Sequence, residues 1–212
     1  MTRLRLSHPL PLFALLLCFS LVAVPGHSQE LLARPLDITE LTQSAGTIVH
    51  GRVMAVQQGT HPDFPNVAVV NVTVQVFRNI RGAAGQQITF RQWVQPVRQL
   101  GVANAPARKL RVAAGYTVGQ ELVLFLYPNS RYGLTSPVGA DQGRFAVLRD
   151  ASGAHVRNSA GNAVVFGNLQ ANARRIGVQV SQAEVNATAK PAMDLDSFLS
   201  LVSRLAQSGV AQ

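Results

Sequence analysis

Cysteine is almost absent from this chain of 212 residues, whose single thiol, Cys18, lies in an apolar N-terminal stretch. A bacterial lipoprotein needs a small residue just before its lipidated cysteine, and Leu17 is not small. We predict that this stretch is removed, which excludes disulfides, thiolate metal sites and a cysteine nucleophile from the mature chain. An ordinary hydrophobic core must hold the mature chain together, and its length suffices for one domain.

The N-terminus has the three parts of a secretory signal peptide. Arg3 and Arg5 precede an apolar run over residues 10–24, and Gly26 and Ser28 place small side chains before a cut after residue 28. An uncleaved anchor is the alternative, but about 15 apolar residues are short for a span that needs ~20. We therefore expect cleavage of residues 1–28, no stable membrane span, and export to the periplasm or the exterior.

Acidic residues are absent between Phe64 and Gln120. Without Arg3 and Arg5 the chain keeps 17 basic and 10 acidic residues, and the whole excess falls in this window. Such a field favours anionic partners, although a charge run is more often a solvated face. The cations of the window are Arg78, Arg81, Arg91, Arg98, Arg108, Lys109 and Arg111.

Motifs for catalysis are also missing. The chain has no H-E-x-x-H, no G-x-S-x-G, no S-x-x-K and no phosphate loop. The histidines outside the N-terminal stretch, His50, His61 and His155, are scattered, and only His61 has a nearby carboxylate, Asp63. Because a zinc site needs three or four converging ligands, we interpret His61 and Asp63 as solvated turn residues. We predict no enzyme activity, no cofactor and no metal.

What is present is a series of short strands. Val70, Val72, Val74 and Val76 fall on one face of a period-two pattern over residues 66–77, which indicates a half-buried strand. Several such segments separated by turn residues are typical of a sandwich or barrel. The expected strands are 47–56, 66–77, 87–93, 121–127, 134–139, 143–150, 154–158 and 163–168.

The first strand contains the pair His50 and Gly51. A glycine inside a strand marks a bulge or a sharp bend, because no side chain obstructs the close approach of another backbone. The alternation places Gly51 on the inward face with Val49 and Val53. It places His50 beside Arg52 on the wetter face. We therefore predict a bend at this pair rather than a functional site.

Helices are expected near both ends. Asp37 and Glu40 form a capping-box-like start for a helix over residues 38–44. A second helix is predicted within residues 193–208, with Asp194 as its cap. Its apolar stripe at helical spacing indicates contact with the sheet. The stripe comprises Leu195, Phe198, Leu199, Val202 and Leu205.

A string of motifs carries a resemblance. "LTQSAGTIVHGRVMAV", "VNVTVQVFRNIRG", "GQQITF", "GYTVGQELVLFLY" and "DQGRF" occur in this order between residues 36 and 150. In this the chain resembles exported bacterial proteins with one OB-like barrel, similar in layout to the netrin-like modules that include tissue inhibitors of metalloproteases. The resemblance implies a fold and an exported location but no activity. Those inhibitors reach the catalytic metal with an N-terminal cysteine, which the mature chain lacks, so that mechanism is not transferred.

Together these patterns predict a mainly β protein with flanking helices. The sheet is expected to be a small OB-like antiparallel barrel, closed or partly open, within residues 29–168. Residues 169–192 are polar and small, and we interpret them as a tether to the C-terminal helix.

The leading functional hypothesis is a non-catalytic binding module. It would hold an anionic envelope component or an acidic protein partner through the basic loop 94–116, as OB-type barrels bind through one face and its loops. Trp93 is either a stacking platform or a cap on the barrel end. Nucleic acid is disfavoured by the compartment and by the few strand aromatics. The candidate site residues are Arg91, Trp93, Arg98, Arg108, Lys109 and Arg111.

The alternative hypothesis is an extracytoplasmic enzyme inhibitor or accessory domain that acts on a protease. A scaffold whose charge serves only solubility is a third. The sequence leaves open the ligand, the oligomeric state and the surface that the C-terminal helix contacts.

Overall fold

The structure of the protein is a computed structural model that describes residues 34–82, 85–94, 115–159, 161–188, 190 and 192–208. The predicted signal peptide lies outside these residues. Residues 33–212 belong to one unit, and the description below concerns that unit.

Seven strands form one antiparallel sheet, in the order β3-β2-β1-β4-β5-β6-β7. The end strands β3 and β7 do not pair with each other among the described residues, so the sheet is not closed into a barrel. The mainly β prediction is confirmed, and the closed version of the barrel is wrong. The strands are β1 (Thr47–Thr60), β2 (Ala68–Arg81), β3 (Gln87–Trp93), β4 (Glu121–Leu126), β5 (Arg144–Asp150), β6 (Gly153–Asn158) and β7 (Met193–Asp194).

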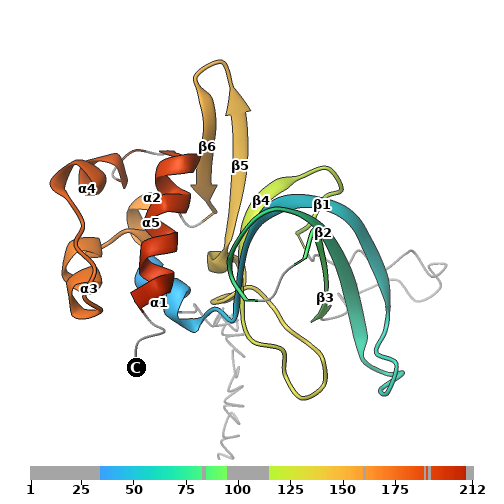
Figure 1. Ribbon diagram of the computed structural model, residues 1–212. Coiled ribbons are helices and arrows are strands. Elements are labelled where there is room, and N and C mark those ends of the chain that lie inside the picture. The colour runs from blue at the N-terminus through green and yellow to red at the C-terminus, as the bar shows by residue number, and fades with distance from the viewer. Residues whose placement is uncertain are drawn as a thin grey trace, which may run out of the picture. The chain divides into compact units, whose positions relative to one another are not determined.

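The long strands β1 and β2 curve together as a pair of arcs (Figure 1). Their register shifts between His50 and Gly51, which marks a bulge. A Cβ atom added to Gly51 would lie 2.1 Å from the backbone oxygen of Gln75. Only glycine allows the two strands to approach so closely, and the predicted bend at this position is confirmed.

Two hydrophobic cores lie against opposite faces of β1. Val49 and Val53 belong to the core inside the curved strands, with valines of β2 and leucines of β4. Ile48, the next residue along the chain from Val49, belongs to the other core, which contains the helices. The curved-strand core comprises Val49, Val53, Val70, Val72, Val74, Phe90, Val94, Leu122, Leu124 and Leu126.

The described residues contain five α-helices, which lie to one side of the β5–β6 hairpin, opposite the curved strands (Figure 1). In α1 the side chain of Asp37 accepts from the backbone of Glu40, whose own carboxylate accepts from the backbone N–H of Asp37, so the capping box is confirmed. The apolar stripe of α5 is buried in the core that contains the helices, as predicted. The helices are α1 (Ile38–Ser44), α2 (Asn162–Val165), α3 (Leu169–Arg175), α4 (Gln182–Thr188) and α5 (Leu195–Ser208), with a 3-10 turn η1 (Ala140–Gly143) before β5.

Arg81, at the end of β2, joins the sheet to two helix ends. Its guanidinium donates to the backbone oxygens of Thr42 and Ala45 at the end of α1, at 2.5 and 3.3 Å. It also donates to the oxygen of Ala206 near the end of α5. A cation suits these positions because helix C-termini leave carbonyls unpaired. One cation of the acid-free window thus has a structural role.

Three segments differ from the sequence prediction. Residues 134–139 form no strand, although Pro137 makes an isolated bridge to Leu126. Residues 163–168, expected as a strand, contain most of α2 and the turn after it. The range 169–192, expected as a polar tether, contains α3 and α4, and Leu169 and Val180 are buried in the core that contains the helices.

Candidate functional site

The structure describes two of the six predicted site residues. Arg91 and Trp93 are the last outward-facing residues of β3, at the edge of the sheet. Arg98, Arg108, Lys109 and Arg111, with most of the predicted loop 94–116, lie outside the described residues.

Trp93 is an exposed side chain at the end of β3, with 54% of its surface accessible. Trp93 is therefore not buried as we expected of a cap on the barrel end. Arg91 is half-buried, and its Nε donates to Oδ1 of Asn71 on β2 at 3.2 Å. The backbone oxygen of Arg91 accepts from the N–H of Thr135 at 2.9 Å. This bond fixes the loop after β4 against the edge of the sheet.

His61 ties the same loop to the turn between β1 and β2. Its Nε2 donates to the backbone oxygen of Tyr132 at 2.8 Å, and its Nδ1 accepts from the N–H of Asp63 at 3.1 Å. Only 1% of His61 is exposed. The prediction of a solvated turn residue is wrong for His61, whose two ring nitrogens are both used to hold loops together.

Two exposed aromatic rings, of Phe64 and Tyr132, lie next to His61. Phe64 packs on His61 with ring centroids 5.0 Å apart, and Tyr132 meets Phe64 edge-on at 5.4 Å. The guanidinium of Arg131 lies 4.7 Å from the centre of the Tyr132 ring. Phe64 and Tyr132 are each 43% exposed.

We name Phe64, Arg91, Trp93, Arg131 and Tyr132 the aromatic–arginine surface. Its two parts are joined by the loop after β4, which bonds to both Arg91 and His61. Exposed aromatic rings beside guanidinium groups can stack on a ligand and bind its anionic groups. Sequence reasoning missed Phe64, Arg131 and Tyr132, because they lie in turns that no period distinguishes.

A second polar cluster is buried between β1, β4 and β5. The carboxylate of Glu121 accepts from Nε2 of His50 at 2.9 Å and from Arg149 at 2.6 and 3.1 Å. His50 lies on the face of Arg52, opposite Val49 and Val53, as expected, but it is buried there and only 7% exposed. The His50 ring also packs edge-on against the ring of Phe77. The guanidinium of Arg52 lies over the Phe77 ring as well.

The hydrogen bonds from Arg149 lower the pKa of Glu121 to about 2, and those from His50 act in the same direction against the cost of burial. The carboxylate is therefore ionised and fully occupied by its partners. This arrangement stabilises the fold and leaves no free base for catalysis at Glu121.

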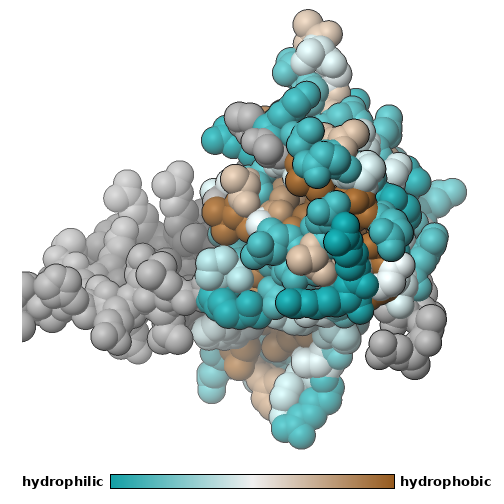
Figure 2. All heavy atoms as spheres, turned by 90° about the vertical axis from the view of Figure 1, so that its left-hand side faces the viewer, coloured by the Kyte–Doolittle hydropathy of each residue, from teal (hydrophilic) through white to brown (hydrophobic). Residues whose placement is uncertain are grey.

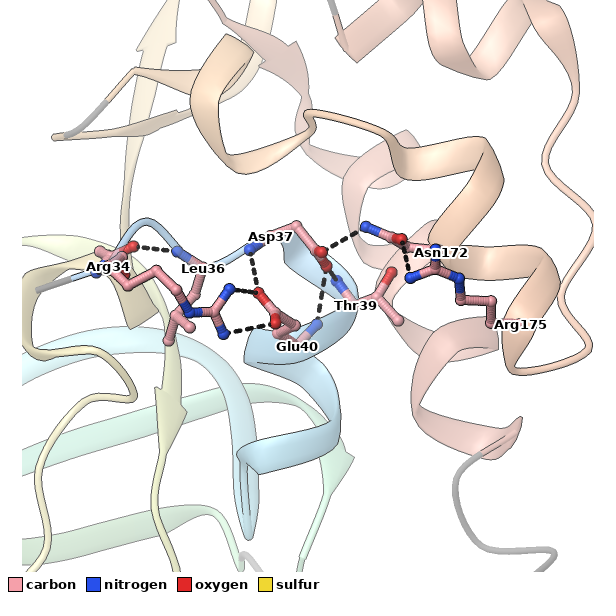
Figure 3. A network of polar contacts seen from close by, with 8 residues as sticks. Arg34, Leu36, Asp37, Thr39, Glu40, Asn172 and Arg175 are labelled. Atoms are coloured by element: carbon pink, nitrogen blue, oxygen red, sulfur yellow. Dashed lines mark hydrogen bonds and ion pairs between the residues drawn. The ribbon is translucent and has the colours of Figure 1, made fainter.

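A groove of about 800 Å³ lies between α1 and the α2–α3 segment. A row of polar contacts crosses it (Figure 3). Arg34 pairs with Glu40 at 2.7 Å, Asn172 donates to Asp37 at 2.6 Å, and Arg175 donates to Asn172 at 3.2 Å. The surface on the side of the helices shows polar side chains around a band of apolar ones (Figure 2).

Possible metal ligands were sought among the residues that the structure describes. No group of three or more His, Cys, Asp or Glu side chains converges there as metal ligands would. Within the same residues, no helix is long and apolar enough to cross a membrane.

Comparison with protein-family models, curated proteins and solved structures finds no match to this chain.

Proposed function

We propose that the protein is an exported, non-catalytic binding module that holds an anionic envelope component or an acidic protein partner. The binding surface is the aromatic–arginine surface together with the basic loop 94–116, which follows Trp93 in sequence. We also propose that the curved strands β1–β4 correspond to the OB-like unit that the sequence motifs resemble. OB-type units bind ligands through one face and its loops, which agrees with this use of the sheet edge.

The observation that carries the proposal is the exposure of Trp93 beside Arg91. Large aromatic side chains are mostly buried, so a half-exposed tryptophan at the end of an edge strand needs a reason. Tryptophan, tyrosine and arginine are the residues that contribute most to binding at interfaces. All three residue types occur on the aromatic–arginine surface.

The positive charge of the proposed binding surface favours an anionic ligand. Arg91 and Arg131 are the cations of the surface, and four more cations follow Trp93 within the acid-free window. Arginine suits planar carboxylate and phosphate groups, because its guanidinium donates two parallel hydrogen bonds. An anionic glycan, an anionic lipid headgroup or an acidic protein face would supply such groups.

The test measures binding to defined polyanions as a function of salt. The wild-type protein is titrated with dextran sulfate, polyglutamate and anionic vesicles, with neutral dextran and zwitterionic vesicles as references. We expect the affinity for at least one anion to fall steeply as salt rises. Trp93→Ala should lose about 10-fold in affinity if the ring stacks on the ligand.

A second variant changes Arg98, Arg108, Lys109 and Arg111 to Ala, and should show a shallower salt dependence. Leu148→Ala is the matched control, because Leu148 is 48% exposed on β5, away from the surface. Equal affinities of all variants for every anion would refute the proposal. A defined complex with a protease, unaffected by salt, would instead favour the inhibitor hypothesis.

A further inference from the structure

Two of the three register shifts between β1 and β2 leave a large apolar residue without a partner on the opposite strand. On β2 this extra residue is Phe77, opposite the step from His50 to Gly51, and on β1 it is Met54. Phe77 is 44% exposed and Met54 49% exposed, and neither belongs to either hydrophobic core. Bulges redirect side chains and are frequent beside functional sites. These two bulges therefore present apolar side chains to solvent on neighbouring strands.

A cation lies against the first of these side chains. The guanidinium of Arg52 lies over the Phe77 ring, 5.5 Å from the ring centre. The ring of His50 packs edge-on against Phe77, with ring centres 5.4 Å apart. Arg52 and Met54 are both exposed and two residues apart on β1, so they share one face of the strand. The contacts with the Phe77 ring restrict the Arg52 side chain before any ligand binds, which reduces the entropy that binding must remove.

Arg52 lacks a full counter-charge. Its Nη2 lies 3.5 Å from Oε2 of Glu121, at the limit of a hydrogen bond, whereas Arg149 donates to the same carboxylate at 2.6 and 3.1 Å. The hydrogen bonds to Glu121, and in smaller part the charge of Asp196, raise the pKa of Arg149. Both carboxylates thus act on Arg149. Among the described residues Arg52 has no other hydrogen bond or ion pair, and 47% of its side chain is exposed.

We name Arg52, Met54 and Phe77 the bulge surface. It combines one exposed cation with apolar surface beside it. A carboxylate accepts two parallel hydrogen bonds from a guanidinium group. Arginine, methionine and aromatic residues are enriched at protein interfaces, and the flexible methionine side chain adapts to the shape of a partner. An acidic side chain with an apolar neighbour would match both parts of the bulge surface.

We propose that the bulge surface docks a protein partner through an acidic side chain that has an apolar side chain next to it. The carboxylate pairs with Arg52, and the apolar group packs on Phe77 and Met54. A membrane fits less well, because attraction to anionic lipids takes a cluster of about 4–8 cations and the bulge surface has a single one. The bulge surface shares no residue with the aromatic–arginine surface, and this inference does not rest on the function proposed for that surface.

The test uses short fluorescent peptides with a central glutamate flanked by leucine, valine, phenylalanine or methionine, each paired with the same peptide carrying a central glutamine. Fluorescence anisotropy gives the dissociation constants. We expect at least one glutamate peptide to bind with a dissociation constant below about 1 mM, and its glutamine counterpart about 10-fold more weakly. Arg52→Gln should weaken the glutamate peptide about 10-fold and remove most of the difference between the two peptides, which identifies the ion pair directly.

Phe77→Ala should weaken the same peptide about 5-fold, because the apolar part of the surface is lost. Arg157→Gln is the matched control for Arg52→Gln, because it removes an exposed cation from β6 of the same sheet, and it should leave the affinity unchanged. Arg52 and Phe77 are half exposed, so the melting temperatures of their variants should stay close to that of the wild type. A loss of peptide binding is then separate from a loss of fold.

The proposal is overturned if no glutamate peptide binds, or if Arg52→Gln and Arg157→Gln bind the peptide equally well. Binding to anionic vesicles that is lost in Arg52→Gln, without peptide binding, would overturn it in favour of a membrane. Trp93→Ala tests the aromatic–arginine surface and should leave the peptide affinity unchanged. Either proposal can therefore fail while the other stands.

Discussion

Glu121 and Arg149 meet in a two-pronged contact: Nη2 of the arginine donates to Oε1 at 2.6 Å, and Nε donates to Oε2 at 3.1 Å. The carboxylate is 7% exposed and the guanidinium 59%. The pair joins β4 to the neighbouring strand β5, and the other side of the same carboxylate accepts from His50 on β1. One buried charge therefore joins three adjacent strands, β1, β4 and β5.

Replacing this carboxylate should weaken the fold. Glu121→Gln leaves Arg149 and His50 without their anion, which costs about 2 kcal/mol, because Glu121 is buried but Arg149 is exposed to solvent. The free energy of unfolding in urea measures the loss. Glu184→Gln is the control, because Glu184 pairs with Arg204 on the surface and such pairs contribute about 0–1 kcal/mol. Equal effects of the two changes would contradict the structural role of Glu121.

Acid should weaken the protein in a defined range of pH. The pKa of Glu121 is about 2 in the folded protein, against 4.5 for a free glutamate. A carboxyl whose folded pKa is lowered contributes its stability above the unfolded value and loses it as the pH falls through the folded one. The loss should run from about pH 4.5 to pH 2 and reach about 2 kcal/mol, reduced because Arg149 is exposed to solvent. Urea titrations at several pH values should show this slope, and Glu121→Gln should flatten it.

A methyl group at Gly51 should be poorly tolerated. In Gly51→Ala the new Cβ would lie 2.1 Å from the oxygen of Gln75, so β1 and β2 must separate. We expect a loss of about 3 kcal/mol or a failure to fold. Gly59→Ala tests the same change in the same strand, where nothing lies within 4 Å, and should shift stability by less than about 1 kcal/mol. Thermal melting of both variants decides the matter, and similar melting temperatures would refute the bulge argument.

Export can be tested directly. The full chain with a C-terminal tag, expressed in a Gram-negative host, should be recovered outside the cytoplasm with a mature N-terminus at Gln29, as read by mass spectrometry. Leu16→Arg places a charge in the apolar run and should leave an uncleaved chain inside the cell. An intact N-terminus in the exported wild type would point to a retained anchor instead.

Local patterns predicted the parts of the fold that depend on neighbours in sequence. The capping box of α1 needs only Asp37 and Glu40, three residues apart, and the bounds of that helix were predicted correctly. The alternation along β2 and the stripe of α5 likewise report burial from spacing alone. These signals are physical consequences of helix and strand periods, so they require no knowledge of the partner surface.

Contacts between distant residues could not be predicted in this way. His50 and Glu121 are 71 positions apart. Nothing in the sequence around either residue shows that their side chains form a buried hydrogen bond with each other. The same holds for His61, which finds its acceptor in a loop 71 residues later. The helices within residues 169–192 were missed because their sequences consist mostly of small and polar residues, and the few apolar ones form no clear helical period.

The two cores give β1 a particular place in the dynamics of the chain. Ile48 and Val49 are consecutive, but their side chains are buried in different cores, so neither core can open fully without releasing this strand. Amide protons of β1 should therefore exchange with solvent only through global unfolding, and more slowly than those of the β5–β6 hairpin tip. A chain with two separate apolar interiors would then unfold in a single cooperative step.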